Sequence, residues 1–483
     1  MKQNSIASGI SWKLIERFSV QVIRFVLQIV LARILDPEHY GSLTLMVIFI
    51  TLANVFIQKG FSAALIQDKH VTEEDYSTVF WVSLGIAGIA YGVIWAAAPA
   101  ISQFYRQPEL TEPLRVLALM LLPGALNSLQ QSKASREMNF RKMFLSNVGG
   151  VLAAGSVSIA MACMGFGLWA LVVQSVVSTT VSCLLLHMAS GWKIRRVCNW
   201  KRVGKLLSYG WKLLVSELLD TLYQDLYNLV LGLHFDNGIL GFCNRGKQFP
   251  QFVTTASTST VQSVMLPAMS RQQDDRKQLK ALMRGSVSLS AYIVFPIMAG
   301  LAGVAEPLVE LVLTEKWLPC VPYLQIWCMA MVFIPVQVGC LQGINAVGRS
   351  DVFLKLAVIK TTFSLAALLG AVILWDSPLA IAQVTLITTL ISCVVNAFFC
   401  RRIMGYGLRE QLADIAPSGV LTALMLLVVL PAGMLQLSAI KLLALQVAVG
   451  VTVYLTGSAL LRPRPFLQLL QLGKNWIGKS HPK

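Results

Sequence analysis

The sequence predicts an all-α polytopic membrane protein with about 14 transmembrane helices. Three numbers support this fold class: the 483 residues are 55% hydrophobic, only 13% are charged, and the formal net charge is +17. A soluble domain usually carries about 25% charged residues, and a disordered chain is poor in apolar residues. An ordinary soluble enzyme and a disordered chain are therefore both excluded.

Fourteen segments are long and apolar enough to cross the bilayer, since a transmembrane helix needs about 20 mostly apolar residues. The first lacks the cleavage site of a signal peptide, so we expect the protein to retain it. The first, second, seventh and eighth are too polar to face lipid on all sides. The predicted helices cover residues 10–34, 41–66, 78–103, 113–131, 144–164, 167–190, 206–233, 239–267, 286–313, 319–346, 352–374, 378–400, 416–434 and 439–461.

The basic residues predict the orientation of these helices. With the N-terminus inside, 26 of the 40 Lys and Arg residues fall in cytoplasmic segments, 5 fall in outside segments and 9 lie inside the spans. Cytoplasmic loops of membrane proteins carry such an excess of cations. We therefore expect both termini in the cytoplasm.

Loops, cysteines and histidines offer no sign of an enzyme. No predicted loop exceeds about 20 residues, which leaves no room for a soluble catalytic domain. The nine cysteines include no CxxC pair, and the five histidines do not cluster, so neither a metal site nor a disulfide framework is indicated. We expect no catalytic residues, no metal and no cofactor.

The sequence repeats itself at an offset of 199 to 200 residues. Residues 12–15 (WKLI) match residues 211–214 (WKLL), and the pair Asp36 and Gly41 recurs 200 residues later. Six spans per copy predict two bundles related by a pseudo-two-fold axis along the membrane normal, with substrate bound between them. Chance similarity of short motifs is the alternative. The predicted parts are two six-helix bundles, residues 1–190 and 191–400, and two extra helices with a basic tail, residues 401–483.

One face of the first predicted helix is polar. Arg17, Gln21, Arg24 and Gln28 follow Lys13 at steps of four, four, three and four, which places them on the same face. Arg24 lies near the middle of the span, where snorkelling accounts poorly for a cation. Guanidinium groups bind phosphate bidentately. We therefore assign these residues to the wall of a cavity that binds an anion.

The seventh predicted helix, the repeat partner of the first, carries the opposite charge. Glu217, Asp220, Gln224 and Tyr227 share one of its faces. Glu217 and Asp220 are candidates for coupling transport to a proton or a sodium ion. Internal ion pairing across the bundle is an equally good interpretation.

The eighth predicted helix adds Arg245, Lys247 and Gln248 to the candidate cavity residues. On an ideal helix, Arg245 lies about 100° and Lys247 about 60° from the polar stripe that contains Gln248. Pro250 argues against an ideal register here, so which of the two cations faces the cavity is left open. Lys59, near the inner end of the second span, is the remaining candidate.

Two sets of motifs run along the chain. The first is LARILDPEHYGSLTLMVIF from residue 31, GFSAALIQDKHVTEEDYSTVFW from residue 60 and SREMNFRKM from residue 135. The second is GFCNRGKQFPQ from residue 241, MLPAMSR from residue 265 and EKWLPCVPYLQI from residue 315. Together they resemble the polysaccharide transporter family of the MOP exporter superfamily, and most of all the colanic-acid and teichuronic-acid exporters among the Wzx-like flippases.

This resemblance implies a function. Such a protein moves undecaprenyl-diphosphate-linked oligosaccharide from the cytoplasmic to the periplasmic leaflet of the bacterial inner membrane, by alternating access, for surface polysaccharide biosynthesis. Membrane lipids, a polysaccharide polymerase and the chain-length machinery are the implied partners, and nucleic acid is not one. The related lipid II flippases carry essential arginines on helices 1, 2 and 8. Arg17, Arg24 and Arg245 occupy comparable places, whereas Lys59 departs from the pattern because lysine is a point charge without a bidentate fork.

Two other function classes fit the residues less well. A multidrug or metabolite cation antiporter of the same superfamily would favour carboxylates in its cavity; Glu217 and Asp220 allow this, but Arg17 and Arg24 argue against it. A membrane polymerase or ligase would need a substantial periplasmic loop with catalytic residues, and the predicted outside loops are too short.

Overall fold

The computed structural model is helical along nearly all of the chain that it describes. No β-strand occurs among the described residues, which confirms the all-α fold class. The structure describes residues 19–59, 72–137, 139–192, 214–215, 218, 221–222, 225–270, 272, 275–347, 350–375, 377–433, 435 and 437–479.

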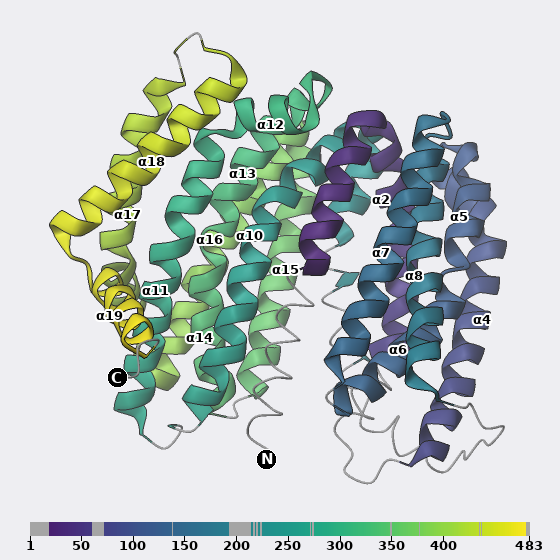
Figure 1. The fold of residues 1–483 in the computed structure, drawn as a ribbon, viewed down its shortest axis with the longest axis horizontal. Helices are drawn as coiled ribbons and strands as arrows, with labels where there is room; N and C mark the ends of the chain where they lie inside the picture. The colour runs from purple at the N-terminus through teal and green to yellow at the C-terminus, as the bar shows by residue number, and fades with distance from the viewer. Residues whose placement is uncertain are drawn as a thin grey trace. The chain divides into compact units, whose positions relative to one another are not determined.

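The chain divides into two compact units, Met1–Gly241 and Phe242–Lys483. Within each unit, neighbouring long helices pack along one another (Figure 1). The predicted parts, residues 1–190, 191–400 and 401–483, follow the repeat and the appended helices rather than compactness. That division stays a prediction.

Unit 1 opens with a helix over residues 19–34 and contains further helices with recognisable ends. α4 begins with a reciprocal cap, in which Thr72 Oγ1 accepts from Asp75 N and Asp75 Oδ2 accepts from Thr72 N. α8 ends at Gly191, which is left-handed with φ 64°, as glycine readily allows. The helices after the first are α2 (Pro37–Asn54) with its π-helical continuation η1 (Val55–Lys59), α4 (Glu73–Phe104), η2 (Pro108–Leu110), α5 (Thr111–Ala118), α6 (Leu121–Arg136), α7 (Phe140–Cys163), α8 (Leu168–Ser190) and a helix over residues 225–234.

The boundary between the two units lies within α10 (Asn237–Ser270). The first turn of α10 belongs to unit 1, and the rest of the helix belongs to unit 2. Asp275 caps the next helix by accepting from the backbone N–H groups of Lys277 and Gln278. The remaining helices are α11 (Arg276–Gly303), α12 (Ala305–Leu313), η3 (Glu315–Cys320), α13 (Val321–Met331), α14 (Ile334–Ala346), α15 (Ser350–Leu374), α16 (Pro378–Met404), α17 (Leu408–Ala432), α18 (Ala439–Leu461) and α19 (Arg464–Lys479).

Three of the predicted single spans are broken in the structure. The span predicted at 113–131 divides into α5 and α6, that at 286–313 into α11 and α12, and that at 319–346 into η3, α13 and α14. Each helix that follows a break, namely α6, α12, α13 and α14, has a proline in its first turn. Proline is tolerated there because the first N–H groups of a helix have no intrahelical acceptor. These prolines are Pro123, Pro307, Pro322 and Pro335.

Pro250 does not end its helix. α10 continues through it from Asn237 to Ser270. Whether the register around Pro250 is ideal stays a prediction.

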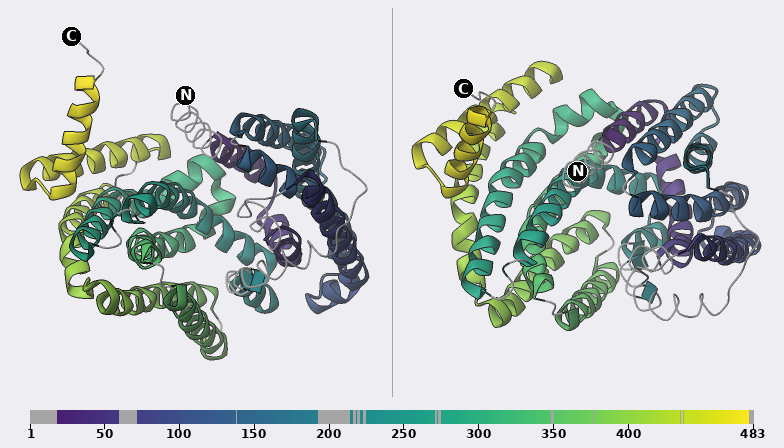
Figure 2. Two further views of the ribbon diagram at one scale, coloured as in Figure 1. Left: turned by 90° about the horizontal axis from the view of Figure 1, so that it is seen from below. Right: turned by 60° about the horizontal axis from the view of Figure 1, so that its bottom comes forward.

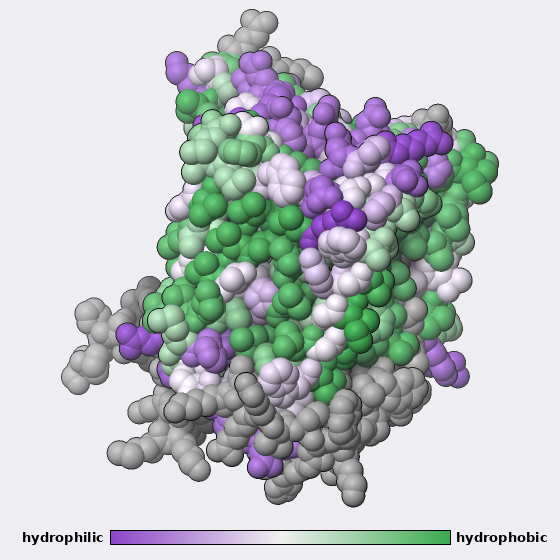
Figure 3. Space-filling model, turned by 90° about the vertical axis from the view of Figure 1, so that its right-hand side faces the viewer, coloured by the Kyte–Doolittle hydropathy of each residue, from purple (hydrophilic) through white to green (hydrophobic). Residues whose placement is uncertain are grey.

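Ten helices in the described chain are long and apolar enough to cross a membrane. Figure 3 shows hydrophobic side chains across the middle of one face, with hydrophilic side chains gathered toward one end. The protein is therefore a multi-pass membrane protein. The count of fourteen spans stays a prediction.

The first turns of α2 and α10 pack closely together within unit 1. A Cβ at Gly41 would collide with the backbone of Asn237, and a Cβ at Gly241 would collide with the backbone of Pro37. Both glycines and both partners are related by the same offset of 200 residues. Equivalent positions of the two copies therefore meet in this contact, and this supports the repeat over chance similarity.

Amide side chains hold this crossing in place. Asn237 Nδ2 donates to Gln107 Oε1 at 2.6 Å, and Gln107 Nε2 donates to Asn237 Oδ1 at 2.9 Å. Asn237 Nδ2 also donates to Ser42 Oγ at 2.7 Å. Both amides are half-buried, and these hydrogen bonds each contribute about 0.5–1.5 kcal/mol to the contact.

Candidate functional site

The helix over residues 19–34 exposes some of its polar residues and also the apolar Val26 and Ile34. Gln21 and Arg24 are exposed and Gln28 is half-buried, whereas Leu31 is fully buried in the apolar cluster that unit 1 forms around it. The predicted wet side of this helix is thus accessible at the two residues nearest its described start. Arg17 lies outside the described residues.

Arg245 on α10 is buried beneath an aromatic ring. Its side chain is 4% exposed, its guanidinium carbon lies 5.0 Å from the centre of the Trp317 ring, and its Nη1 donates to Gln248 Oε1 at 2.5 Å. A cation over an indole face is stabilised by the ring quadrupole. Arg245 and Gln248, both predicted as cavity residues, are therefore brought together, and both serve the packing of unit 2.

Lys247 lies over the ring of a different tryptophan, Trp327. Its Nζ lies 4.9 Å from the centre of the Trp327 ring, and the side chain is half-buried. Between the two cations, Gly246 packs against the start of α13, where a Cβ would collide with the Leu324 backbone. The close approach of α10 to η3 and α13 thus places one cation over each tryptophan. Of the two, Lys247 is the more accessible to a ligand in this state.

The other predicted site residues are not brought together by the described structure. Lys59 is the last residue of η1, and its side chain is not described. Glu217 and Asp220 lie outside the described residues. Their assignment to the cavity and to ion coupling stays a prediction. Among the described residues, no group of three His, Cys, Asp or Glu side chains could hold a metal ion.

An apolar cavity of about 540 Å³ lies in unit 2 among α10, α11, α12, α17 and α18. Gly300 and Gly450 contribute no side chain to its wall, and the Gln446 amide is turned to the Val429 carbonyl at 3.3 Å. The wall is therefore almost wholly hydrocarbon. Sequence reasoning missed this cavity because it treated the last two spans as an appendage without a role.

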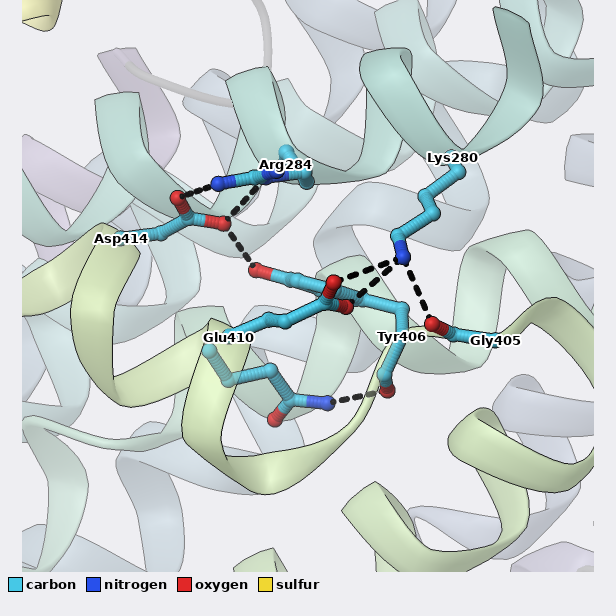
Figure 4. Close-up of polar contacts among 7 residues, drawn as sticks. Lys280, Arg284, Gly405, Tyr406, Glu410 and Asp414 are labelled. Atoms are coloured by element: carbon cyan, nitrogen blue, oxygen red, sulfur yellow. Dashed lines mark hydrogen bonds and ion pairs between the residues drawn. The ribbon is translucent and has the colours of Figure 1, made fainter. Parts of the chain in front are cut away.

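A cluster of charged residues joins α11 to the start of α17 (Figure 4). Lys280 Nζ lies 2.8 Å from Glu410 Oε2. Arg284 donates two hydrogen bonds to Asp414, at 2.6 and 2.8 Å, and Tyr406 donates a third to Asp414 at 2.9 Å. Burial and the hydrogen bond to Asp414 raise the pKa of the Tyr406 phenol. We call these five residues the α11–α17 clamp.

The clamp corrects one sequence-based assignment. The predicted spans 239–267 and 286–313 leave Lys280 and Arg284 in the loop between them, but α11 begins at Arg276, so both residues are helical. Their spacing of four residues places them on one side of α11. The acids Glu410 and Asp414 have the same spacing on α17. The matched spacing lets both pairs form between the two helices, although it does not by itself identify which distant charges meet.

Comparison with known proteins decides the family. Residues 30–322, more than half of the chain, match the family described as polysaccharide biosynthesis protein. The chain belongs to this family. The family resemblance expected from the sequence motifs is confirmed.

Two relatives of this polysaccharide biosynthesis protein are similar along most of their length. The succinoglycan biosynthesis transport protein ExoT of Rhizobium meliloti (strain 1021) is 23% identical over 418 residues, 86% of this chain and 81% of ExoT. The teichuronic acid biosynthesis protein TuaB of Bacillus subtilis (strain 168) is 22% identical over 485 residues, 97% of this chain and 98% of TuaB.

Solved structures show the same fold. The lipid II flippase MurJ in an inward closed conformation has a TM-score of 0.76 at 14% identity, covering 92% of this chain and 98% of MurJ. An inward-facing multidrug resistance MATE transporter of the MOP superfamily has a TM-score of 0.61 at 15% identity, covering 81% of this chain and 98% of that one. This family member therefore has a MOP superfamily fold.

Proposed function

We propose that this protein is a flippase that moves undecaprenyl-diphosphate-linked oligosaccharides from the cytoplasmic to the periplasmic leaflet of the bacterial inner membrane. Membership of a polysaccharide biosynthesis family, relatives named as transport and biosynthesis proteins, and the flippase fold support transport as its activity. The role is that of a transporter and not of an enzyme. Both termini lie in the cytoplasm under this proposal.

The observation that carries the proposal is that Arg24 and Gln21 are both exposed on the helix over residues 19–34, which lies within the first predicted span. A charge near the bilayer centre costs on the order of 2.5–3.5 kcal/mol on insertion scales. Such a residue is retained when it lines a polar path or binds a charged ligand. A diphosphate suits it, because a guanidinium binds phosphate oxygens in a bidentate manner.

The apolar cavity of unit 2 suits the other end of the same lipid. A polyprenyl tail needs a hydrocarbon surface, and the cavity wall offers almost nothing else. Arg24 and Gln21 of unit 1 would contact the diphosphate and sugars. The cavity of unit 2, taken by itself, offers a surface for a hydrocarbon chain.

Alternating access would move the headgroup across the membrane. The sequence repeat at an offset of 199 to 200 residues predicts the two related bundles on which such a mechanism depends. Glu217 and Asp220 are the proposed groups for coupling to a proton or a sodium ion. A polysaccharide polymerase and chain-length machinery are the proposed partners, since they would consume the exported lipid-linked oligosaccharide.

The test is complementation of a strain that lacks this gene, with surface polysaccharide and cytoplasmic lipid-linked oligosaccharide as the two readouts. Arg24→Ala should abolish the polymer and cause undecaprenyl-diphosphate-oligosaccharide to accumulate, at unchanged abundance in the membrane. Arg33→Ala is the matched control, because Arg33 is an exposed arginine on the same helix. Wild-type polymer from the Arg24→Ala strain would overturn the proposal.

The runner-up, a multidrug or metabolite cation antiporter, makes a separate prediction. An antiporter of cationic drugs would raise resistance to cationic amphiphiles when overproduced, with no need for Arg24. We expect no increase in resistance. A clear increase that survives Arg24→Ala would favour the antiporter.

A further inference from the structure

The chain turns sharply where the last predicted span ends. α18 ends at Leu461, Arg462 takes the left-handed conformation with φ 44°, and α19 begins at Arg464. α19 is seen end-on in Figure 1, where α11 runs up the page, and side-on in the left view of Figure 2. α19 therefore runs across the direction of α11 and not along it.

The first turn of α19 is fixed to the rest of unit 2 by one aromatic residue. The Phe466 ring lies 6.5 Å from that of Tyr292 on α11. Tyr292 is held in turn by α18, because its hydroxyl pairs with Ser458 Oγ at 2.7 Å and Tyr454 donates to its carbonyl at 2.7 Å. The start of α19 thus has a defined depth beside the membrane-spanning helices.

Beyond this first turn, α19 leaves leucines uncovered. Leu470 is 46% exposed, and Leu469 is also exposed. On a helix, Arg464, Gln468 and Gln471 share one face, whereas Phe466, Leu469 and Leu470 lie on the other. Such an amphipathic helix favours the boundary between water and hydrocarbon, where both faces are satisfied.

The charge around α19 is of one sign. Arg462 and Arg464 are both exposed. The sequence contains no Asp or Glu after Asp414, whereas Lys and Arg recur as far as Lys483. A cationic amphipathic segment is complementary to anionic headgroups, and each Lys or Arg near such a surface contributes about 1 kcal/mol.

We propose that α19 is an interfacial helix that lies in the surface of the bilayer and binds anionic phospholipid headgroups through Arg462 and Arg464. Phe466 and Tyr292 set its depth, and the leucine face enters the acyl region. The occupant of this surface is lipid. The proposal does not depend on the transported substrate, so it can be tested whether or not the protein is a flippase.

The first experiment measures where the two faces of α19 lie. Leu470→Cys and Gln468→Cys are introduced one at a time into a background without native cysteines, labelled with a polarity-sensitive fluorophore and placed in phosphatidylglycerol vesicles. The label at 470 should report hydrocarbon and respond to quenchers on the lipid chains. The label at 468 should report water. Equal, water-like signals at both positions would overturn the proposal and point to a soluble partner.

The second experiment keeps the native cysteines and measures lipid binding by the purified full-length protein. Retention of phosphatidylglycerol is compared for wild type, Arg462→Gln/Arg464→Gln, and Lys441→Gln, a control at the opposite end of α18. Affinity should fall about fivefold for each arginine removed, with phosphatidylcholine retention unchanged. A double variant that binds phosphatidylglycerol as tightly as the control would contradict the role of the two arginines.

Discussion

At the scale of single residues, the two neighbouring cations of α10 have different surroundings. Arg245 is buried under Trp317 and hydrogen-bonded to Gln248, whereas Lys247 is half-buried over Trp327. A buried cation with fixed partners contributes to the packing of its unit. An accessible cation can contact a ligand without first leaving its partners.

Arg245→Ala should therefore destabilise the protein more than Lys247→Ala. The first change removes a hydrogen bond to a charged group, worth about 1.5–3 kcal/mol, and a desolvated cation–π contact, worth about 2 kcal/mol. The second removes a more exposed contact, worth about 1 kcal/mol or less. Unfolding in mild detergent, with Arg402→Ala as an exposed control, measures the difference. A larger loss of stability for Lys247→Ala would contradict a buried, hydrogen-bonded Arg245.

The α11–α17 clamp gives a second prediction at this scale. Asp414→Asn should cost more stability than Tyr406→Phe, because Asp414 accepts from both Arg284 and Tyr406. We expect about 1 kcal/mol for Tyr406→Phe, which loses one hydrogen bond, and about 2–3 kcal/mol for Asp414→Asn. The exchange Arg284→Asp/Asp414→Arg should recover part of the loss. If neither Asp414→Asn nor Tyr406→Phe lowered the free energy of unfolding, the clamp would not be formed in the membrane.

The pH dependence of the Tyr406 contribution follows from its raised pKa. Because the folded state holds the phenolic proton more tightly than the unfolded state, the contribution of this proton is complete at low pH. It declines only above the unfolded pKa of about 10. The difference between wild type and Tyr406→Phe should therefore be constant from pH 6 to pH 9. A difference that shrinks within this window would contradict the assignment.

At the scale of helices, the crossing of α2 and α10 depends on two glycines. Gly41→Ala and Gly241→Ala should each force the two backbones apart and lower both stability and export. Gly88→Ala on α4 is the matched control, because a Cβ there meets nothing within 4 Å. The control should be neutral or stabilising by up to about 1 kcal/mol. Wild-type export by both crossing variants would show that the close approach is not needed.

Much of the helix pattern could be predicted from the sequence, because long apolar runs bounded by charge are a local signal. The breaks within three spans also have a local signal in the sequence, which is a proline in the first turn of α6, α12, α13 and α14. The pairing of Arg284 with Asp414 could not be predicted in the same way. It joins residues 130 positions apart, and one sequence carries no record of which distant charges meet.

The candidate site likewise has features that local sequence patterns predict and contacts between distant residues that they do not. Gln21 and Arg24, predicted on a common helix face, are both exposed, and their assignment to a cavity wall stays a prediction. Helical spacing could not tell that Trp317 covers Arg245, because that tryptophan lies 72 residues further along the chain. The apolar cavity was missed for a similar reason. Its wall is built from five helices, none of which is unusual by itself.

At the scale of the whole molecule, the +17 charge separates into three contributions. Most of the surplus lies in predicted cytoplasmic segments and sets the orientation of the chain. Arg462 and Arg464 belong to the proposed lipid contact of α19. Arg24, exposed on the first predicted span, is the cation to which we assign a role in transport.

Transport of a lipid-linked diphosphate is the central claim, and a reconstituted system tests it most directly. The purified protein is placed in vesicles that contain undecaprenyl-diphosphate-linked oligosaccharide, and the lipid reaching the opposite leaflet is measured by its accessibility to an impermeant sugar-modifying enzyme. We predict transfer by wild type and by Arg33→Ala, and none by Arg24→Ala. Transfer by Arg24→Ala at the wild-type rate, or no transfer by the wild-type protein when an ion gradient is supplied, would contradict the account.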